Sequence, residues 1–463
     1  MAKQAAKPEA ERVQVGTRFK LDIRKIGING EGIGYYKRKT VFVPGALPGE
    51  TAEVEANRVF PNYIQGKLIR VTKKSKDRAV PPCPVYDQCG GCQLQHMSYE
   101  AQLRAKEEIV RESFARYTGL NELPMLPIFG MEDPWKYRNK AQMQVGHQKG
   151  KMITGLYAPG SHQLVDLSGC PIHHPAVNRV IAQVKQIAER FKIPVYQERK
   201  RTGTLRNIVV RCGFASEDLQ LTLVTAGRDL PQKKELIAAV TREIPQVTSI
   251  SQNINPHKTS LIFGDETLHL WGKETMEERL GELRYELSPR AFFQLNPEQT
   301  LKLYDEVKRA AALTGKEEVM DLYCGTGTIA LWLAPHAKKV FGIEMIPEAI
   351  EDAKQNAKNN GITNAEFMVG KAEQLLPQRI QKGERPDVIV VDPPRTGCDD
   401  KLLKAVIQAK PKRFVYVSCN PSTLAKDCKV LLDNGFRIEW IRPVDMFPQT
   451  AHVECCSLFV RND

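Results

Sequence analysis

The chain has 463 residues, of which 42% are hydrophobic and 26% are charged, as is typical of a globular protein made of two to four domains. Its first residues, MAKQAAKPEA, lack the apolar core of a signal peptide, and no run approaches the roughly 18 apolar residues that a membrane span requires. The sequence therefore predicts a cytoplasmic protein with no membrane partner.

The formal net charge of +13 is concentrated near the start of the chain, where residues 1–80 hold 17 Lys and Arg against 8 Asp and Glu. Such a surplus attracts polyanions by releasing their counterions, although a solvated basic face without a partner gives the same composition. The chain also has 11 cysteines. An odd number without an export signal favours thiols, metal ligands or catalysis over a disulfide framework.

Residues 12–70 contain short apolar-alternating segments separated by Gly-rich corners, from FKLDI to YIQGKLIRV. This pattern predicts a small closed β-barrel, and the basic KKSKDR cluster with the Pro pair at 81–82 predicts a linker after it. Basic residues interleave with aromatic ones between two of the predicted strands, which suits contact with a nucleic-acid strand. These residues are Tyr35, Tyr36, Lys37, Arg38 and Lys39.

Residues 71–285 are predicted to form a mixed α+β central domain, with helices over 99–117 and near 175–192 and 232–243. Three cysteines open it as Cys83-x5-Cys89-x2-Cys92, and Cys170 in LSGCPIHHP offers a fourth thiol. Four thiolates can hold a [4Fe–4S] cluster or a zinc ion, and the spacing does not choose between them. The nearby histidines leave a mixed zinc site open; they are His96, His173 and His174.

Residues 286–463 contain the apolar runs VMDLY, KVFGIE, DVIVVD and RFVYVS, each followed by a loop and a helical stretch. Buried parallel strands have this pattern, so the sequence predicts a doubly wound, Rossmann-like α/β sheet. Ligands of such sheets lie at the carboxyl ends of the strands. The loops that follow the four runs are therefore the candidate site.

The segment DLYCGTGTIA leads from a strand through Gly325 and Gly327 into a helix, and the next strand ends at Glu344. Glycines let the backbone approach a ligand closely, and an acidic residue at that distance can accept hydrogen bonds from both ribose hydroxyls. The pattern suits NAD as well as S-adenosylmethionine. Asp321 before the loop and the second acidic loop DPPR favour the methyl donor.

Three further loops carry reactive groups. Asp392 follows a strand and is stiffened by Pro393 and Pro394, Cys419 ends the next strand, and Glu454 begins the last one. We expect the pKa of the Cys419 thiol to be lowered by the helix that starts nearby. A thiolate that adds to C6 of uracil makes C5 nucleophilic, and a base must then remove the C5 proton. Cys419 suits the first task and Glu454 the second, while Asp392 suits contact with the flipped base or the donor.

Nearly the whole chain resembles the bacterial uracil-C5 RNA methyltransferases of the kind that modify 23S ribosomal RNA. Residues 12–70, with VFVPGALPGE, resemble a TRAM domain, which is an OB-like RNA-binding barrel. The motifs FFQLN, DLYCGTGTIAL, DPPRTG and VSCNPSTLAKD resemble those of the catalytic domain.

The resemblance implies S-adenosylmethionine as methyl donor, Cys419 as nucleophile and Glu454 as base. It also implies a [4Fe–4S] cluster held by Cys83, Cys89, Cys92 and Cys170, with zinc as the alternative. The residues expected to bind the donor are Gln294, Tyr323, Gly325, Glu344 and Asp392.

The predicted partner is RNA, with 23S rRNA favoured over tRNA, and the protein is expected to act as a monomer. A second RNA surface is predicted in WKYRNKAQMQV, with Lys136, Arg138 and Lys140. Two alternative functions remain: a tRNA uracil-C5 methyltransferase and a non-catalytic RNA-binding iron–sulfur scaffold. Cytosine-C5 methylation uses the same thiolate chemistry, whereas an amino-group methyltransferase would carry an aromatic residue where Arg395 follows DPP.

Overall fold

The computed structural model describes residues 13–120 and 122–462, and residue 12, the predicted first residue of the barrel, lies outside this range. The chain folds into two compact units. One contains the barrel and its linker through Pro81, together with Cys92–Ala105 and Gln449–Ala451, and the other contains the rest. The domain boundaries at 12–70, 71–285 and 286–463 remain predictions.

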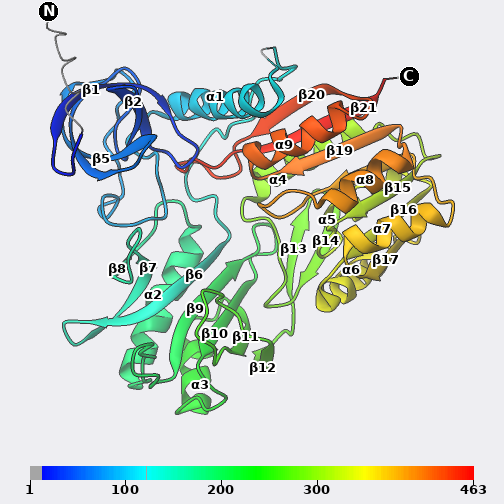
Figure 1. Cartoon of the computed structure of the whole chain (residues 1–463). Coiled ribbons are helices and arrows are strands. Elements are labelled where there is room, and N and C mark those ends of the chain that lie inside the picture. Colours follow the sequence, from blue (N-terminus) through cyan, green and yellow to red (C-terminus); the bar gives the residue numbers. More distant parts are fainter. Residues whose placement is uncertain (1–12, 121, 463) are drawn as a thin grey trace, which may run out of the picture. The chain divides into compact units, whose positions relative to one another are not determined.

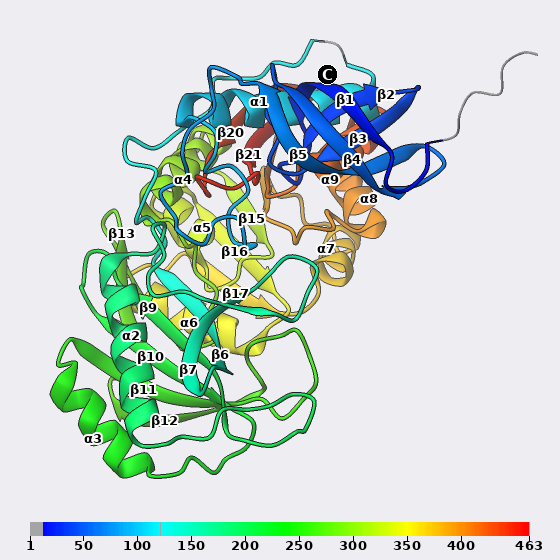
Figure 2. The same cartoon turned by 90° about the vertical axis from the view of Figure 1, so that its left-hand side faces the viewer.

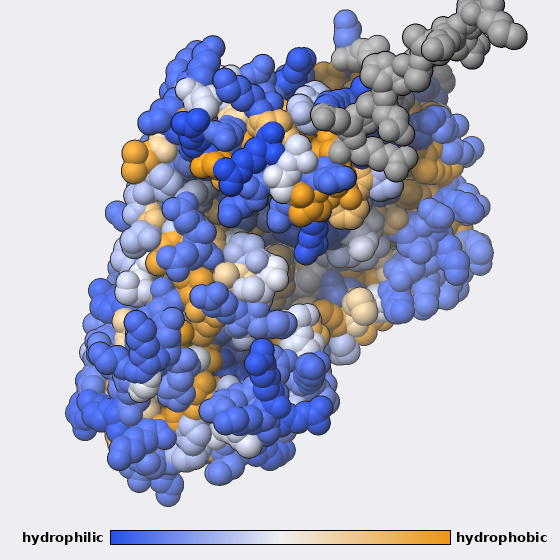
Figure 3. All heavy atoms as spheres, turned by 60° about the vertical axis from the view of Figure 1, so that its left-hand side comes forward, coloured by the Kyte–Doolittle hydropathy of each residue, from blue (hydrophilic) through white to orange (hydrophobic). Residues whose placement is uncertain are grey.

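The face of the molecule that Figure 3 shows is mainly hydrophilic, with hydrophobic residues in smaller areas between the polar ones. Scattered apolar side chains of this kind are ordinary on the surface of folded proteins. Every helix within residues 13–120 and 122–462 is too short or too polar to cross a membrane.

The first unit confirms the predicted barrel, whose five strands close in the order β1-β2-β3-β5-β4 (Figure 1). Alternate side chains of β1 point inward, which is why its exposed and buried residues alternate. The barrel core includes Leu21, Val41 and Val54. The strands are β1 (Arg18–Ile26), β2 (Gly32–Tyr36), β3 (Lys39–Val43), β4 (Thr51–Val59) and β5 (Tyr63–Lys73).

A buried ion pair attaches the linker to the barrel. Nε and Nη2 of Arg78 donate to the two carboxylate oxygens of Glu50 at 2.6 and 2.7 Å, and Nη2 also donates to the Gly45 carbonyl. Burial acts to raise the pKa of Glu50, but Arg78 and the backbone N–H groups of Leu47 and Ser75 together hold that pKa below its usual value. The carboxylate is thus ionised and bidentate, which fixes the start of the linker.

The second unit contains Pro82–Gly91, the part of helix α1 (Tyr99–Thr118) from Lys106 onward, and a seven-stranded sheet in the order β12-β11-β10-β9-β6-β7-β8. Neighbouring strands are antiparallel except β10 and β11, which are joined through α3. Helices α2 and α3 lie on one face of this sheet (Figure 2). The strands are β6 (Lys140–Gln148), β7 (Lys151–Tyr157), β8 (Leu164–Asp166), β9 (Leu205–Cys212), β10 (Leu219–Thr225), β11 (Val247–Ile254) and β12 (Glu266–Gly272).

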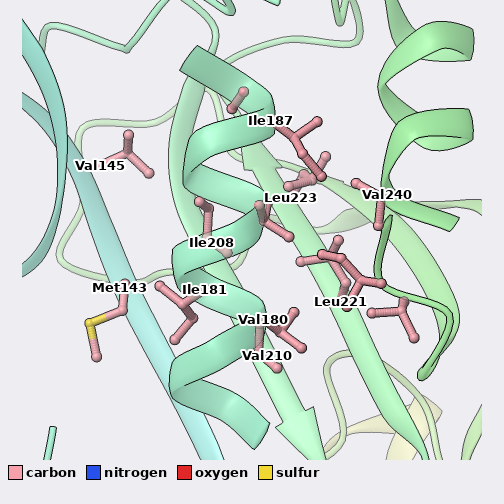
Figure 4. Packing of buried hydrophobic residues seen from close by; sticks show 14 of the residues in the cluster. Met143, Val145, Val180, Ile181, Ile187, Ile208, Val210, Leu221, Leu223 and Val240 are labelled. Carbon is pink, nitrogen blue, oxygen red and sulfur yellow. The ribbon is translucent and has the colours of Figure 1, made fainter. Parts of the chain in front are cut away.

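The helices predicted near 175–192 and 232–243 are confirmed as α2 (Pro175–Arg190) and α3 (Lys233–Glu243). The apolar stripe of α2, which includes Val180 and Ile187, packs against the strands beneath it (Figure 4). Helical spacing of the apolar residues, at i, i+3, i+4 and i+7, places them all toward the sheet. This packing gives the central sheet one covered face.

A hairpin of β13 (Met276–Leu280) and β14 (Leu283–Leu287) leads to the second seven-stranded sheet, in the order β17-β16-β15-β18-β19-β21-β20. Strands β15 to β19 are mutually parallel, and β21 is antiparallel to both of its neighbours. The strands are β15 (Glu318–Leu322), β16 (Lys339–Glu344), β17 (Ala365–Val369), β18 (Val388–Val391), β19 (Arg413–Ser418), β20 (Phe436–Val444) and β21 (Glu454–Arg461).

Helices cover both faces of this sheet, as predicted for a doubly wound fold (Figure 1). Val415 and Val417 of β19 share a core with α4 and α5, whereas Tyr416 points the other way and donates to Asp427 of α9. The order of the strands reverses between β15 and β18, so this sheet's switch point lies there. The helices are α4 (Pro297–Ala311), α5 (Thr328–Leu333), α6 (Pro347–Asn359), α7 (Ala372–Gln381), α8 (Asp400–Ala409) and α9 (Pro421–Leu432), and a 3-10 turn covers Ala334–His336.

Candidate active site

A cavity of about 380 Å3 opens at the carboxyl ends of β15 and β16, beside the switch point. This volume lies in the range of roughly 300–1,000 Å3 that small-molecule sites occupy. Its walls come from the loop at 288–294, the segment 321–329, the start of α6 and the loop after β18. The structure brings all five predicted donor-binding residues to this one cavity: Gln294, Tyr323, Gly325, Glu344 and Asp392.

The loop between β15 and α5 adopts a backbone that favours glycine. Gly325 and Gly327 have φ of 54° and 79°, and a Cβ on Gly327 would lie 3.0 Å from Phe367. Tyr323 also has a positive φ of 67°, which a side chain with a Cβ adopts only at a cost. The Gly325 N–H donates to Glu344 at 3.2 Å, so the loop and the carboxylate at the end of β16 are joined directly.

The cavity has an apolar rim, which the spacing of the motifs in the sequence did not predict. Phe292 is 66% exposed, and Met345 and Ile346 are also exposed although they line the cavity. Apolar side chains at such an opening suit a flat heteroaromatic ring. The only sequence signal for this rim was the FFQLN motif, because the loop that carries Phe292 lies before the first strand of the sheet.

Cys419 and Glu454 come together at the same edge of the sheet through the pairing of β19 with β21. Ser418, the last residue of β19, is opposite Cys455, so Cys419, which follows β19, and Glu454, which begins antiparallel β21, are neighbours. Asp392 follows β18, the strand on the other side of β19. The predicted nucleophile, base and second carboxylate therefore lie within one cluster, and Asp392 also lines the cavity.

The expectation that the nearby helix lowers the pKa of Cys419 is wrong for this structure. Burial raises the pKa of the thiol to about 11, the charges of Glu454 and Asp392 add to the rise, and Arg395 acts in the opposite direction. In the first turn of α9, the side chain of Asn420 accepts from the Ser422 N–H, so that N–H does not point to the thiol alone. Cys419 lies one residue before that cap.

The two carboxyl groups of the cluster are also perturbed. Burial raises the pKa of Asp392 and of Glu454. The charge of Asp392 raises the pKa of Glu454 further, and Arg395 lowers it. Two carboxylates in one buried site do not both ionise readily, so the pair retains a proton at a pH where an exposed carboxyl would have lost it.

Arg395 is the cation of this cluster. Its side chain is exposed, and Nη2 lies 3.3 Å from Nε2 of His452, two residues before Glu454. Burial lowers the pKa of His452 to about 4, and Arg395 contributes to that shift. His452 is therefore neutral at pH 7, and its ring can accept a hydrogen bond from the guanidinium.

The connection that leads into β21 is anchored by a fully buried ion pair. Lys106 of α1 donates to Asp445 at 2.5 Å and to the Phe447 carbonyl at 3.1 Å. Gln299 of α4 donates to the Asp445 carbonyl at 2.9 Å. Burial lowers the pKa of Lys106, and the charge of Asp445 opposes this shift. The charged form of Lys106 is therefore stabilised in this buried place by its contact with Asp445.

The four predicted metal ligands are not all brought together by the structure. Cys83, Cys89 and Cys170 lie in the second unit, close enough that the charges of the first two raise the pKa of the third. Among residues 13–120 and 122–462, however, no three His, Cys, Asp or Glu side chains are arranged to hold a metal ion. Cys92 and His96 belong to the first unit. His173 is buried, and Nδ1 of His174 accepts from the Ala176 N–H as the cap of α2.

The predicted RNA-contact residues lie on two surfaces. Lys37 and Arg38 form the two-residue turn between β2 and β3, where both have positive φ, and Lys39 donates to the Phe60 carbonyl. Tyr35 is exposed, and Lys37 lies over the ring of Tyr36. On the second surface Lys136 is exposed, Arg138 donates to the Lys140 carbonyl, and the Lys140 ammonium lies 5.1 Å from the ring centre of Phe263.

Comparison with known proteins defines the class. Residues 98–462 match the tRNA (uracil-5-)-methyltransferase family, and residues 12–69 match the TRAM domain. An uncharacterized RNA methyltransferase of Halalkalibacterium halodurans is 57% identical over 99% of both chains, and one of Bacillus cereus is 52% identical over 98% of this chain and 99% of its own. The fold and site are thus those of an RNA methyltransferase that uses S-adenosylmethionine.

A solved structure agrees over nearly the full length. The tRNA (uracil-54, C5)-methyltransferase of Pyrococcus abyssi, in complex with S-adenosyl-L-homocysteine, covers 96% of this chain and 100% of its own. Its TM-score is 0.75 at 29% sequence identity. The chain belongs to the tRNA (uracil-5-)-methyltransferase family, and it carries an N-terminal TRAM domain.

The raised pKa of Cys419 gives a direct prediction for the enzyme without RNA. We expect alkylation of Cys419 by iodoacetamide to be slow at pH 7 and to rise about tenfold per pH unit, because only the thiolate reacts. Peptide mass spectrometry across pH 7–11 measures this rate at Cys419 alone. Glu454→Gln removes a negative charge and should speed alkylation at a given pH, whereas Arg395→Gln should slow it. A Cys419 that alkylates at the rate of an ordinary exposed thiol would contradict the electrostatics described.

Proposed function

We propose that this enzyme methylates C5 of a uracil in structured RNA through a covalent bond between Cys419 and C6 of the base. The observation that carries the proposal is the grouping of Cys419, Glu454 and Asp392 at one sheet edge, with Asp392 shared by the cavity. A thiol, two carboxyls and a donor cavity are the groups that this reaction requires.

Glu344, Tyr323, Gly325 and Gln294 are proposed to hold S-adenosylmethionine in the cavity. When bound, the donor supplies an electrophilic methyl group on a sulfonium. Cys419 loses its proton as its sulfur bonds to C6, and the C5=C6 electron pair moves toward C4–O4 as an enolate. Cys419 is partly exposed, so that proton can leave to water, and the carboxylate of Glu454 stays available for the later step.

After the methyl group is on C5, Glu454 is proposed to remove the C5 proton. The electron pair of that C–H bond re-forms C5=C6, the C6–sulfur bond breaks, and the thiolate leaves. The raised pKa of Glu454 makes its carboxylate a stronger base than an exposed one. The rate should therefore fall with decreasing pH from well above the ordinary carboxyl pKa of 4.5.

The target is proposed to be 23S rRNA. This choice rests on the combined TRAM barrel and cysteine set, which the sequence shares in pattern with rRNA-modifying enzymes. A tRNA target is the second candidate, favoured by the similarity to the Pyrococcus abyssi tRNA enzyme over 96% of the chain. We further propose that the enzyme acts as a monomer.

Cys419→Ala and Glu454→Gln test the chemistry. Cys419→Ala should lower 5-methyluridine formation by a factor on the order of 10^4 or more while RNA binding persists, because the nucleophile is lost. Glu454→Gln should accumulate an RNA–protein adduct on a denaturing gel, because the thiolate cannot leave until the C5 proton is removed.

Nucleoside mass spectrometry of rRNA and tRNA, from cells with and without the gene, identifies the base and the target. Product formed by Cys419→Ala would exclude the covalent route. RNA binding by the wild type without consumption of donor would instead favour the non-catalytic scaffold.

The turn of Lys37 and Arg38 is proposed as an RNA contact. A turn with two positive φ values favours Asn-Gly, and each residue with a Cβ costs about 1 kcal/mol there. The K37N/R38G double substitution should therefore stabilise the barrel by about 1–2 kcal/mol and yet weaken RNA binding. Filter binding at several salt concentrations should show a shallower salt dependence.

Lys149→Asn is the matched control for this turn, since Lys149 has a φ of 50° in the turn between β6 and β7. It changes a strained turn without touching the barrel. Hydrogen exchange of the barrel strands measures stability in each variant. A K37N/R38G protein that binds RNA as tightly as the wild type would exclude the contact.

Cys83, Cys89, Cys92 and Cys170 are proposed, from the sequence resemblance, to hold a [4Fe–4S] cluster, with zinc as the alternative. Three of these thiols lie in one unit and interact electrostatically, but they must turn toward a common point to bind. Iron, sulfide and zinc analysis of anaerobically purified protein should find about four irons per chain. Cys170→Ser should lose the metal, and protein that contains neither metal would exclude both sites.

A further inference from the structure

The residue after the proposed nucleophile joins two loops of the active site. Oδ1 of Asn420 accepts from the Ser422 N–H at 3.1 Å, and Nδ2 of the same side chain donates to the Arg395 carbonyl at 3.0 Å. We propose that Asn420 is a positioning residue, which holds the Cys419 loop against the loop of Asp392 and Arg395. This inference rests on the proposed function.

The Arg395 carbonyl is held from α9 and its cap. It accepts from Asn420 and also from Oγ1 of Thr423 at 3.3 Å. Further along the same loop, the Cys398 N–H donates to Asp427 of α9 at 2.8 Å. Helix α9 therefore holds this loop at two places, and Asn420 is the contact nearest to the thiol in sequence.

The helix cap by itself does not require asparagine. Serine, aspartate and asparagine all cap helices well, because each offers an oxygen to the first N–H groups. Aspartate offers acceptors alone, and a serine hydroxyl is a single atom, whereas the amide accepts with Oδ1 and donates with Nδ2, which are two separate atoms. The bond to Arg395 is therefore the part of this arrangement that calls for Asn420.

The bond from Asn420 to the Arg395 carbonyl matters because it positions Arg395, the cation beside Cys419. Cys419 is faced by Glu454 from β21 and by Asp392 and Arg395 from the loop after β18. Two of these three groups disfavour the thiolate, and Arg395 favours it. The guanidinium of Arg395 contacts His452, whereas the backbone carbonyl of Arg395 contacts Asn420. The two ends of Arg395 are thus held by different residues. Loss of the Asn420 bond leaves Thr423 as the remaining side-chain donor to the Arg395 carbonyl, so the backbone end is held less firmly.

The test is Asn420→Ser, which keeps a good cap and removes the Nδ2 group that donates to the Arg395 carbonyl. We expect 5-methyluridine formation in single turnover to fall about 10- to 100-fold, the scale of a small misplacement of reacting groups. Affinity for S-adenosylmethionine by calorimetry should not change, because Asn420 is outside the cavity wall. The pH midpoint of Cys419 alkylation should move upward, which a purely structural role of the side chain would not produce.

Asn434→Ser is the matched control, since Asn434 is exposed and donates to the Val430 carbonyl at the other end of α9. It should leave both rates unchanged. Thr423→Val removes the second donor to Arg395 and should shift alkylation in the same direction by less, and it serves if Asn420→Ser does not fold. Wild-type turnover and alkylation in folded Asn420→Ser, or in Thr423→Val if only that variant folds, would overturn the inference. Alkylation needs no RNA, so its outcome is independent of whether Cys419→Ala abolishes methylation.

Discussion

The order of strands in the C-terminal sheet is the constraint on which the site depends. Parallel β15, β16, β18 and β19 all end at one edge, so their following loops meet there. To place one more side chain at this edge after a parallel strand, the chain would need a further parallel strand and a crossover helix. Antiparallel β21 avoids this, because it begins where β19 ends and places Glu454 beside Cys419. The last strand thus brings the second reactive group to the first without a crossover.

Much of the fold could be predicted because its patterns are local. The alternation in β1, the stripe of α2 and the buried runs of the parallel strands each follow from the period of one element. The position of the cavity could be anticipated for the same reason, since Gly325, Glu344 and Asp392 all end or follow a predicted strand. The rim at Phe292 follows from no such rule, because it depends on how the loop after β14 folds over the sheet.

The electrostatics of the site could not be predicted from local pattern. A thiol before a helix suggests a lowered pKa, but the pKa of Cys419 is set by burial and by carboxyls from two other segments of the chain. The cap formed by Asn420 also uses one of the N–H groups at the start of that helix. The arrangement of the four cysteines could not be predicted either. Spacing places Cys83 and Cys89 close in sequence, but it does not determine where their side chains point.

The buried pair of Lys106 and Asp445 joins residues 339 positions apart. Ribosomes add about 5–20 residues per second, so Lys106 is synthesised roughly 20 to 70 s before its partner. An ammonium cannot stay buried without its counter-ion, so this part of α1 stays hydrated on the nascent chain. The ion pair that anchors the connection into β21 therefore forms only after Asp445 has been synthesised.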